Sequence, residues 1–409
     1  MMSQTTLPST AESNNSLRKQ ARMELGAVMS RRTLIFVGVF VVLAVLFHLQ
    51  SNGLFLTPRN LSLMLRQSAI LAVVAAGVAI LMTMSEIDLS IGSAVFLCGV
   101  VSAELATQGN LPLIVVVLAA LGTGVLLGAV QGAWVVFLGI PSFIATLAGL
   151  LAFRGIGLLW TNAATIGPVS PEFTALSESY IPPGISYVII AIALAFGVGF
   201  IVIRDRRKSA KRRMEAREGI LARPPVPMGR TIGEIALLVV PLGILAWIVG
   251  GFLGIPMALV WVVIIVIALS VLMLRTTYGR GAYLLGANRE AAIYSGVNVK
   301  RTVFIGFIIM GALYGVAGVL LTARLGSSTP GAGEFLELDA IAAAVIGGVS
   351  LRGGVGKVAG AVMGAVLLTT INNGMSILNI SSFSQAIIKG LILIAALGVD
   401  AYILRRSSR

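Results

Sequence analysis

The sequence contains one cysteine, Cys98, and one histidine, His48, among its 409 residues. A single cysteine excludes a disulfide within the chain, and a single histidine offers no cluster for a metal site. Charged residues are also scarce, at 11% of the chain against about 25% in typical soluble domains. Hydrophobic residues make up 57%, and many runs approach the roughly 20 apolar residues that cross a bilayer. We therefore predict an all-α polytopic membrane protein.

The N-terminal region lacks the apolar segment of a secretory signal peptide. Residues 1–30 are polar and contain several basic residues, so we expect a retained cytoplasmic tail. The transmembrane domain is predicted over 31–404, followed by a short basic tail over 405–409.

Acidic residues are few, 16 against 30 basic ones, and the basic residues are unevenly distributed along the chain. Of the 30 lysines and arginines, 25 lie in stretches that separate apolar runs, and ten of these lie in 204–231. The positive-inside rule places such stretches in the cytoplasm, whereas a nucleic-acid surface would not need this distribution. We predict a cytoplasmic basic loop over 204–231 and a second cytoplasmic connection over 275–301.

Threading the apolar runs between the basic stretches gives ten to twelve helical segments and places both termini in the cytoplasm. The predicted segments are 33–50, 61–84, 91–107, 112–138, 142–160, 184–203, 232–252, 256–274, 301–324, 339–349, 357–375 and 384–404.

The stretch "SEIDLSIGS" places two carboxylates, Glu86 and Asp88, between two apolar runs. On a helix, residues two apart point to nearly opposite sides, so the pair would not share a face. In one interpretation the stretch is a tight connection in which Asp88 or Ser90 caps the next helix. In the other it is a re-entrant element whose Glu86, Asp88 and Ser90 line a translocation path, since a carboxylate in lipid is costly.

The second half of the chain partly repeats the first. "GVLLGAVQGAWVVFLGIPSFIATLAG" over 124–149 resembles "AVLLTTINNGMSILNISSFSQAIIKG" over 365–390, and the predicted topology runs them in opposite directions. An inverted repeat is typical of transporters, with the path at the repeat interface. Packing of small residues could also produce the similarity.

The connection over 275–301 contains a short amphipathic stretch with close spacing of small residues. Alanines permit close approach to a partner, and Gly296 can end a short helix in a left-handed conformation. We predict a docking element, the alternative being a solvated surface helix. Its predicted residues are Gly286, Glu290, Ala291, Ala292 and Gly296.

Four polar residues fall within or near the end of predicted spans: Gln131, Arg154, Asn372 and Asn373. They are candidates for lining a translocation path, because polar side chains there could hydrogen-bond a polar solute. Helix packing is the alternative for the amides, since polar groups bond between helices. Arg154 could instead reach the membrane surface or pair with Glu86 or Glu334.

Two predicted outward loops carry acidic residues and no basic ones. Glu172 and Glu178 lie in 162–183, and Glu334 and Glu337 lie in 326–338. Complementary charge on a partner would speed encounter, so these four are candidates for docking.

These features together resemble the permease subunits of bacterial sugar ABC importers, in the ribose/xylose branch. The resemblance rests on the EAA-x-x-x-G spacing at Glu290, on "EIDLSIGS", on "IPSFIATLAGLLAFRGI" and on "IGGVSLRGGVGKVAGAVMG", and it covers most of 55–404. It implies a type II importer fold and a homodimer in the bacterial inner membrane. It also implies a separate cytoplasmic ABC ATPase and a periplasmic sugar-binding protein. The implied solute is D-xylose or a related pentose, with ribose, galactose-type hexoses and nucleosides as alternatives.

Catalytic motifs are absent from the sequence. A phosphate-binding loop requires G-x-x-x-x-G-K-[ST], and "LRGGVGKV" has Leu351 at the first glycine and Val358 after the lysine. We expect no cofactor or metal in this chain, and ATP and Mg²⁺ to be used by the partner. The rival class is an ion-coupled secondary transporter with Asp88 or Glu86 as the ion site, which would have no ATPase to dock.

Overall fold

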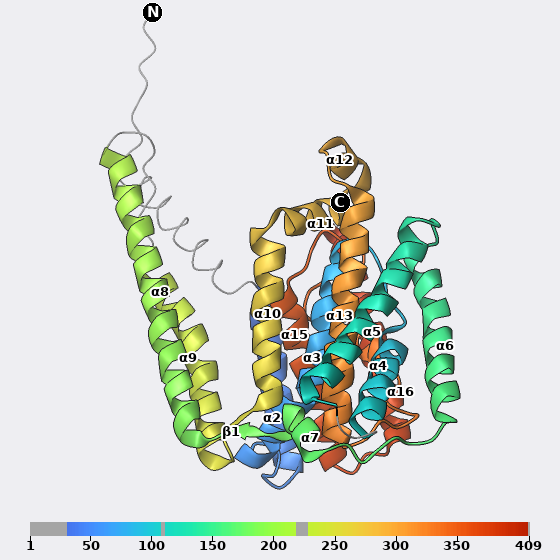
Figure 1. Ribbon diagram of the computed structural model, residues 1–409. Coiled ribbons are helices and arrows are strands. Elements are labelled where there is room, and N and C mark those ends of the chain that lie inside the picture. The colour runs from blue at the N-terminus through green and yellow to red at the C-terminus, as the bar shows by residue number, and fades with distance from the viewer. Residues whose placement is uncertain (1–30, 108–110, 218–227, 408–409) are drawn as a thin grey trace, which may run out of the picture. The chain divides into compact units, whose positions relative to one another are not determined.

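The computed structural model describes residues 31–107, 111–217 and 228–407. Among these residues, eight helices are long and apolar enough to cross a membrane (Figure 1). The predicted polytopic helical class is confirmed, and most predicted spans coincide with helices to within a few residues. The predicted tail over 1–30 lies outside the described residues.

The elements are α2 (Arg31–Gln50), α3 (Pro58–Thr83), α4 (Ile91–Thr107), α5 (Leu113–Val136), α6 (Ser142–Thr161), α7 (Pro171–Glu178), β1 (Tyr180–Ile181), α8 (Pro183–Arg217), α9 (Met228–Gly251), β2 (Ile255–Pro256), α10 (Met257–Arg275), α11 (Thr277–Ala287), α12 (Arg289–Tyr294), α13 (Val299–Leu325), α14 (Leu336–Ile346), α15 (Val358–Ile377) and α16 (Ser382–Ser407).

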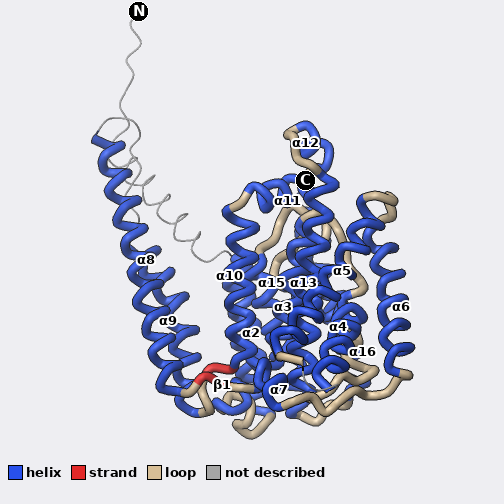
Figure 2. The backbone as a smooth tube through the Cα atoms, in the orientation of Figure 1, coloured by secondary structure: helices blue, strands red, loops and turns tan. Residues whose placement is uncertain are grey.

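Contacts divide the chain into two compact units, a division that the sequence did not indicate. Unit 1 contains α2, α8 and α9, and unit 2 contains the other elements, with α3 entering it at Asn60. In unit 1, α8 and α9 lie side by side as an antiparallel pair (Figure 2). Because α8 continues to Arg217 and α9 begins at Met228, most of the predicted loop 204–231 is helical.

The centre of unit 2 is formed by α3, α4 and α13, most of whose residues are buried. Residues 68–84, which comprise the C-terminal part of α3 and the residue after it, are all buried. Glycines bring α5 and α13 into backbone contact: a Cβ on Gly311 would lie 2.4 Å from the Gly124 carbonyl oxygen. Small residues at such crossings allow close packing where hydrophobicity alone gives no driving force.

The two similar stretches, 124–149 and 365–390, have corresponding structures. Each contains a helix break, after Val136 in the first and after Ile377 in the second. Close contacts show that α3 and α5 both run antiparallel to α13. The C-terminal half of α15 lies beside the start of α3, so α15 is antiparallel to α3. The stretches therefore run in opposite directions, as predicted.

The two ends of unit 2 differ in their short elements. Helices α11 and α12 lie at one end, which we call the α12 end (Figure 1). Helix α7 and the antiparallel pair β1–β2 lie at the other, the α7 end, where Ile181 pairs with Ile255. The charge pattern predicts that the α12 end faces the cytoplasm.

Candidate functional site

The stretch 86–90 connects α3 to α4 without regular secondary structure, so the helical geometry assumed for Glu86 and Asp88 is wrong. The start of α6 supplies partners for its backbone. The N–H of Ile87 donates to Ser142 Oγ at 3.2 Å, and the N–H of Leu89 donates to Thr146 Oγ1 at 3.0 Å. Backbone donors that are shielded from water need such partners, so the "IPSFIAT" motif holds this segment in its non-helical form.

Asp88 is the main acceptor in a buried polar network. Its carboxylate accepts from the N–H and the hydroxyl of Ser90, at 2.8 and 2.7 Å, and from the Tyr314 hydroxyl. Gln131 donates to Ser90 Oγ at 2.6 Å, and its amide oxygen lies 3.2 Å from the Tyr314 hydroxyl. The network joins three predicted path residues. Sequence reasoning missed Tyr314, because a tyrosine in an apolar run is usually a packing residue.

The start of α4 tests the prediction that Asp88 or Ser90 caps this helix. Ser90 directly precedes α4, but its hydroxyl is bonded within the network. The carboxylate of Glu337 instead accepts from the N–H of Gly92, in the first turn of α4. A negative charge there is stabilised by the helix dipole. The predicted cap role thus falls to Glu337, which had been predicted as a docking residue.

Glu86 faces a different neighbour from Asp88. Its buried carboxylate lies 3.6 Å from a guanidinium nitrogen of Arg289, whose side chain is 61% exposed. Burial raises the pKa of the Glu86 carboxyl, while the Ser142 hydroxyl and Arg289 act in the opposite direction. An exposed residue of α12 is therefore linked to the buried segment.

Three backbone segments meet beside Glu86 with almost no side chain between them. Ser85 donates from its hydroxyl to the Arg352 carbonyl at 2.8 Å, and the Gly354 N–H donates to the Thr83 carbonyl at 2.9 Å. A Cβ on Gly286 would lie only 1.9 Å from the Thr83 oxygen. The end of α3, the end of α11 and the loop 347–356 thus form one junction, which explains the last two glycines of "GGVSLRGG", Gly353 and Gly354.

The predicted docking element consists of α11 and α12. The N–H of Ala291 donates to the Asn288 side chain at 2.9 Å, which starts α12. Gly296 has φ +80°, the left-handed conformation predicted for it. Ala292 is fully buried, and Tyr294 is 90% exposed.

The exposed tip of α12 was not predicted in full. Glu290, Ile293 and Tyr294 are exposed there, and the last two present apolar surface to solvent. The EAA-x-x-x-G spacing indicated the element, but only the fold shows which of its side chains point outward.

A polar cavity of about 290 Å³ lies in the half of unit 2 nearer the α7 end. Of the predicted path residues, Asn372 lines it, together with Gln67 and Asp339. The side-chain oxygen of Asn372 is buried, and among the described residues no donor reaches it. Asp339 also pairs with Lys389 at 2.9 Å. The remaining lining residues are Ile70, Leu71, Leu321, Arg324, Gly333, Glu334, Leu336 and Thr369.

Two other predicted path residues have structural partners. Asn373 exchanges two side-chain hydrogen bonds with Asn60, at 2.9 and 3.1 Å, which fits the packing alternative. Arg154 donates to the carbonyls of Pro330 and Ala332, both at 2.9 Å. Arg154 therefore holds the segment before α14 and makes no described pair with Glu86.

The four predicted docking carboxylates are not equivalent. Glu172 and Glu334 are exposed. Glu178 lies 2.5 Å from Arg66 Nη1 and is half-buried, and Glu337 is half-buried against α4. The expectation of four available acids is thus reduced to two.

The sequence pattern of one family, described as branched-chain amino acid transport system / permease component, matches residues 60–397. The xylose transport system permease of Escherichia coli K12 is 38% identical over 376 residues, 91% of this chain and 93% of the relative. That of Haemophilus influenzae is 36% identical, over 90% of this chain and 95% of the relative. The ribose import permease of Escherichia coli K12 is 32% identical, over 91% and 94%. No solved structure matches the chain.

Proposed function

The chain belongs to the branched-chain amino acid transport system / permease component family, and from that premise we propose its specific role. It is the membrane-spanning permease subunit of an ATP-binding-cassette importer and forms the path for a monosaccharide, D-xylose or a related pentose. The assignment of a pentose as the solute rests on the 38% identity with a xylose permease over nearly the whole length of both chains.

The cavity beside Asn372 is the proposed sugar-facing part of the path. Amide, carboxylate and threonine groups line it together with aliphatic side chains. Such a combination suits a neutral, hydroxyl-rich solute, and small-molecule sites place a few polar groups in apolar walls in the same way. The amide oxygen of Asn372, which no donor among the described residues reaches, would accept a hydrogen bond from a sugar hydroxyl.

ATP hydrolysis belongs to a separate subunit in this proposal. The chain has no phosphate-binding loop motif, and the tip of α12 supplies a surface for a cytoplasmic ATPase. Movement of α12 would reach Glu86 through Arg289 and reach the end of α3 through the Gly286 junction. ATP and Mg²⁺ therefore enter the account only as ligands of the partner.

Two further partners are proposed, a periplasmic binding protein and a second copy of this chain. A periplasmic sugar-binding protein would dock at the α7 end, where Glu172 is exposed, and a second copy of this chain would complete the path. Both termini would be cytoplasmic in a bacterial inner membrane.

The test is uptake by the reconstituted complex with its ATPase and candidate binding proteins. Labelled xylose, ribose, galactose and a nucleoside are offered one at a time. The proposal predicts that xylose, or a closely related pentose, accumulates most. Preferential uptake of a nucleoside or a hexose would overturn the pentose assignment but keep the importer.

The ion-coupled alternative makes a different prediction for Asp88. In the importer, Asp88→Asn should keep part of the uptake, because an amide can bond both Ser90 and Tyr314. In an ion-coupled carrier, the same change should abolish accumulation together with its pH dependence.

A further inference from the structure

The hairpin of α8 and α9 in unit 1 carries a cavity that the transport proposal does not use. The apolar part of α8 ends at Ile203, and that of α9 begins after Glu234. Beyond these points both helices continue, with α8 reaching Arg217 and α9 starting at Met228. A helix needs about 20 residues to cross the hydrocarbon core, so the extensions protrude into the headgroup region and beyond.

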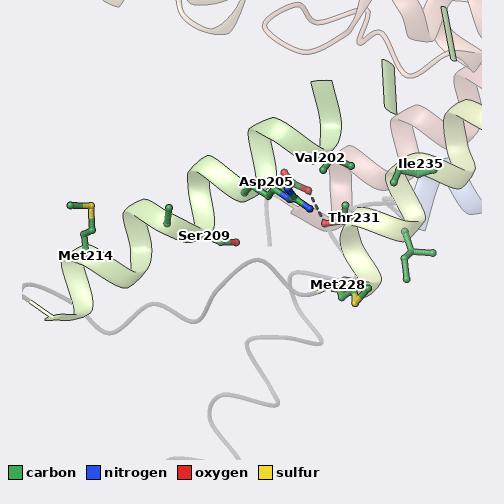
Figure 3. A pocket seen from close by; sticks show the side chains of 10 residues that line it. Val202, Asp205, Ser209, Met214, Met228, Thr231 and Ile235 are labelled. Carbon is green, nitrogen blue, oxygen red and sulfur yellow. Dashed lines mark hydrogen bonds between the residues drawn. The ribbon is translucent and has the colours of Figure 1, made fainter. Parts of the chain in front are cut away.

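A network of paired charges forms the base of the cavity. Arg204 donates to Asp205 at 2.8 Å and also to Glu234, and Arg230 donates to Glu234 at 3.1 Å. Thr231 donates to Asp205 at 2.9 Å and ties the two helices together (Figure 3). Both carboxylates are thus already paired with arginines.

The cavity itself measures about 690 Å³ and has two kinds of wall. Arg206 of α8 lines it. Ser209, Asp205 and Thr231 also line it (Figure 3). Val202, Ile232 and Ile235 form an apolar wall on the membrane side of Arg206 and Ser209, and Ile232 is 57% exposed. Met214 and Met228 line the cavity at the opposite side, farther from the membrane span.

The outer surface of the same helix is strongly basic. Arg206, Arg207, Lys208 and Lys211 are all exposed on α8. Clusters of basic residues directly beyond a transmembrane helix attract anionic lipid headgroups. The positive charge alone would be enough to orient the protein in the membrane, so it does not account for the cavity. A cavity with one polar and one apolar wall suits a bound amphiphile.

We propose that the cavity between α8 and α9 binds an anionic phospholipid. The headgroup phosphate lies against Arg206 and Ser209, and the glycerol and first acyl carbons lie against Val202, Ile232 and Ile235, on the membrane side of the phosphate. The location at the ends of two apolar helices favours a lipid over a water-soluble partner. The site is independent of which solute the permease carries.

The experiment uses the full-length protein in detergent and native mass spectrometry. Short-chain phosphatidylglycerol is the probe, with phosphatidylcholine and inorganic phosphate measured separately. Replacing Arg206 by Gln should reduce retained phosphatidylglycerol about fivefold, because a charge-assisted contact to phosphate is lost. Arg207→Gln is the matched control: it removes the same charge one position away, where the side chain does not line the cavity.

A second variant separates loss of binding from loss of folding. Ala210→Glu places a carboxylate on the cavity wall at an exposed position, and both residues favour helix. It should also reduce phosphatidylglycerol retention, with the thermal unfolding midpoint unchanged. Equal losses for Arg206→Gln and Arg207→Gln, equal retention of the two lipids, or retention of inorganic phosphate as strong as that of the lipid would each overturn the proposal.

Discussion

Arg289, on the short helix α12, lies 3.6 Å from the buried carboxylate of Glu86, in the segment between α3 and α4. Arg289 is largely exposed, and its neighbour Tyr294 forms the tip of the surface proposed to meet the ATPase. The same segment continues, two residues later, into the network of Asp88. One short stretch thus connects the proposed docking surface with the buried interior of unit 2.

Glu86 predicts a specific dependence of stability on pH. Because burial raises its pKa in the folded protein, folding favours the protonated form, and stability falls as pH rises through the raised pKa. Glu86→Gln removes this ionisation. It should raise the unfolding midpoint at neutral pH, by roughly 2 °C for about 1 kcal/mol, and the gain should shrink in acid.

Thermal unfolding of the purified protein over a pH series measures this effect. Glu290→Gln is the control, since Glu290 is exposed and directly follows Arg289 on α12. A lower midpoint for Glu86→Gln at neutral pH would mean that the pair with Arg289 outweighs the cost of burial.

Asn372 and Asn373 allow the path to be separated from packing. Asn372→Leu removes a buried oxygen with no described partner, which should leave stability unchanged or improved. It should nevertheless lower sugar uptake, because a proposed sugar contact is lost. Asn373→Leu breaks the reciprocal pair with Asn60 and should lower stability, with a cost of about 1–3 kcal/mol for the amide left behind.

Uptake and unfolding are measured on both variants in the same lipid. If Asn372→Leu transports as well as the parent, the cavity is not part of the path.

The tip of α12 provides a test of docking that does not disturb the fold. Tyr294→Glu changes an exposed side chain, so the permease should fold and insert normally. It should release the ATPase, since a charge replaces an aromatic anchor of the kind that dominates interfaces. Tyr294→Phe keeps the aromatic surface and should retain the partner.

Co-purification of the ATPase with each variant is the measurement. Ala292 is a poor position for this test, because it is fully buried and a bulky residue there would disrupt α12 itself. Normal retention of the ATPase by Tyr294→Glu would place docking elsewhere.

An exposed acid at the α7 end predicts how the binding protein docks. Glu172→Gln should raise the concentration of binding protein needed for half-maximal stimulation of ATP hydrolysis. Added salt should weaken stimulation of the parent more than that of the variant, because exposed charges are screened beyond about 8–10 Å. Glu215→Gln, in the stretch predicted to be cytoplasmic, should have no effect. Docking does not depend on the Glu172 carboxylate if parent and variant respond alike.

The sequence predicted the helices well and their side-chain environments poorly. Apolar runs of membrane length leave few alternatives, so the predicted spans coincide with helices. The non-helical form of 86–90 could not be predicted, because its partners Ser142 and Thr146 lie on α6, distant in sequence. Tyr314 and Glu337 were misread for the same reason: their contacts, to Asp88 and to Gly92, are distant in sequence.

The length of α8 was also underestimated, since the charge pattern marks where a span leaves the membrane and not where its helix ends. Spacing alone identified Gly296 correctly, because its left-handed conformation is a local property of the chain.

The energy source of uptake tests the central claim most directly. Proteoliposomes containing the permease and its ATPase, with binding protein and labelled xylose outside, are compared with internal ATP, with a non-hydrolysable ATP analogue and with an imposed proton gradient. The account predicts accumulation with ATP alone and none with the other two, and it predicts that Tyr294→Glu abolishes the ATP-driven accumulation. Accumulation driven by the proton gradient without ATP would contradict it.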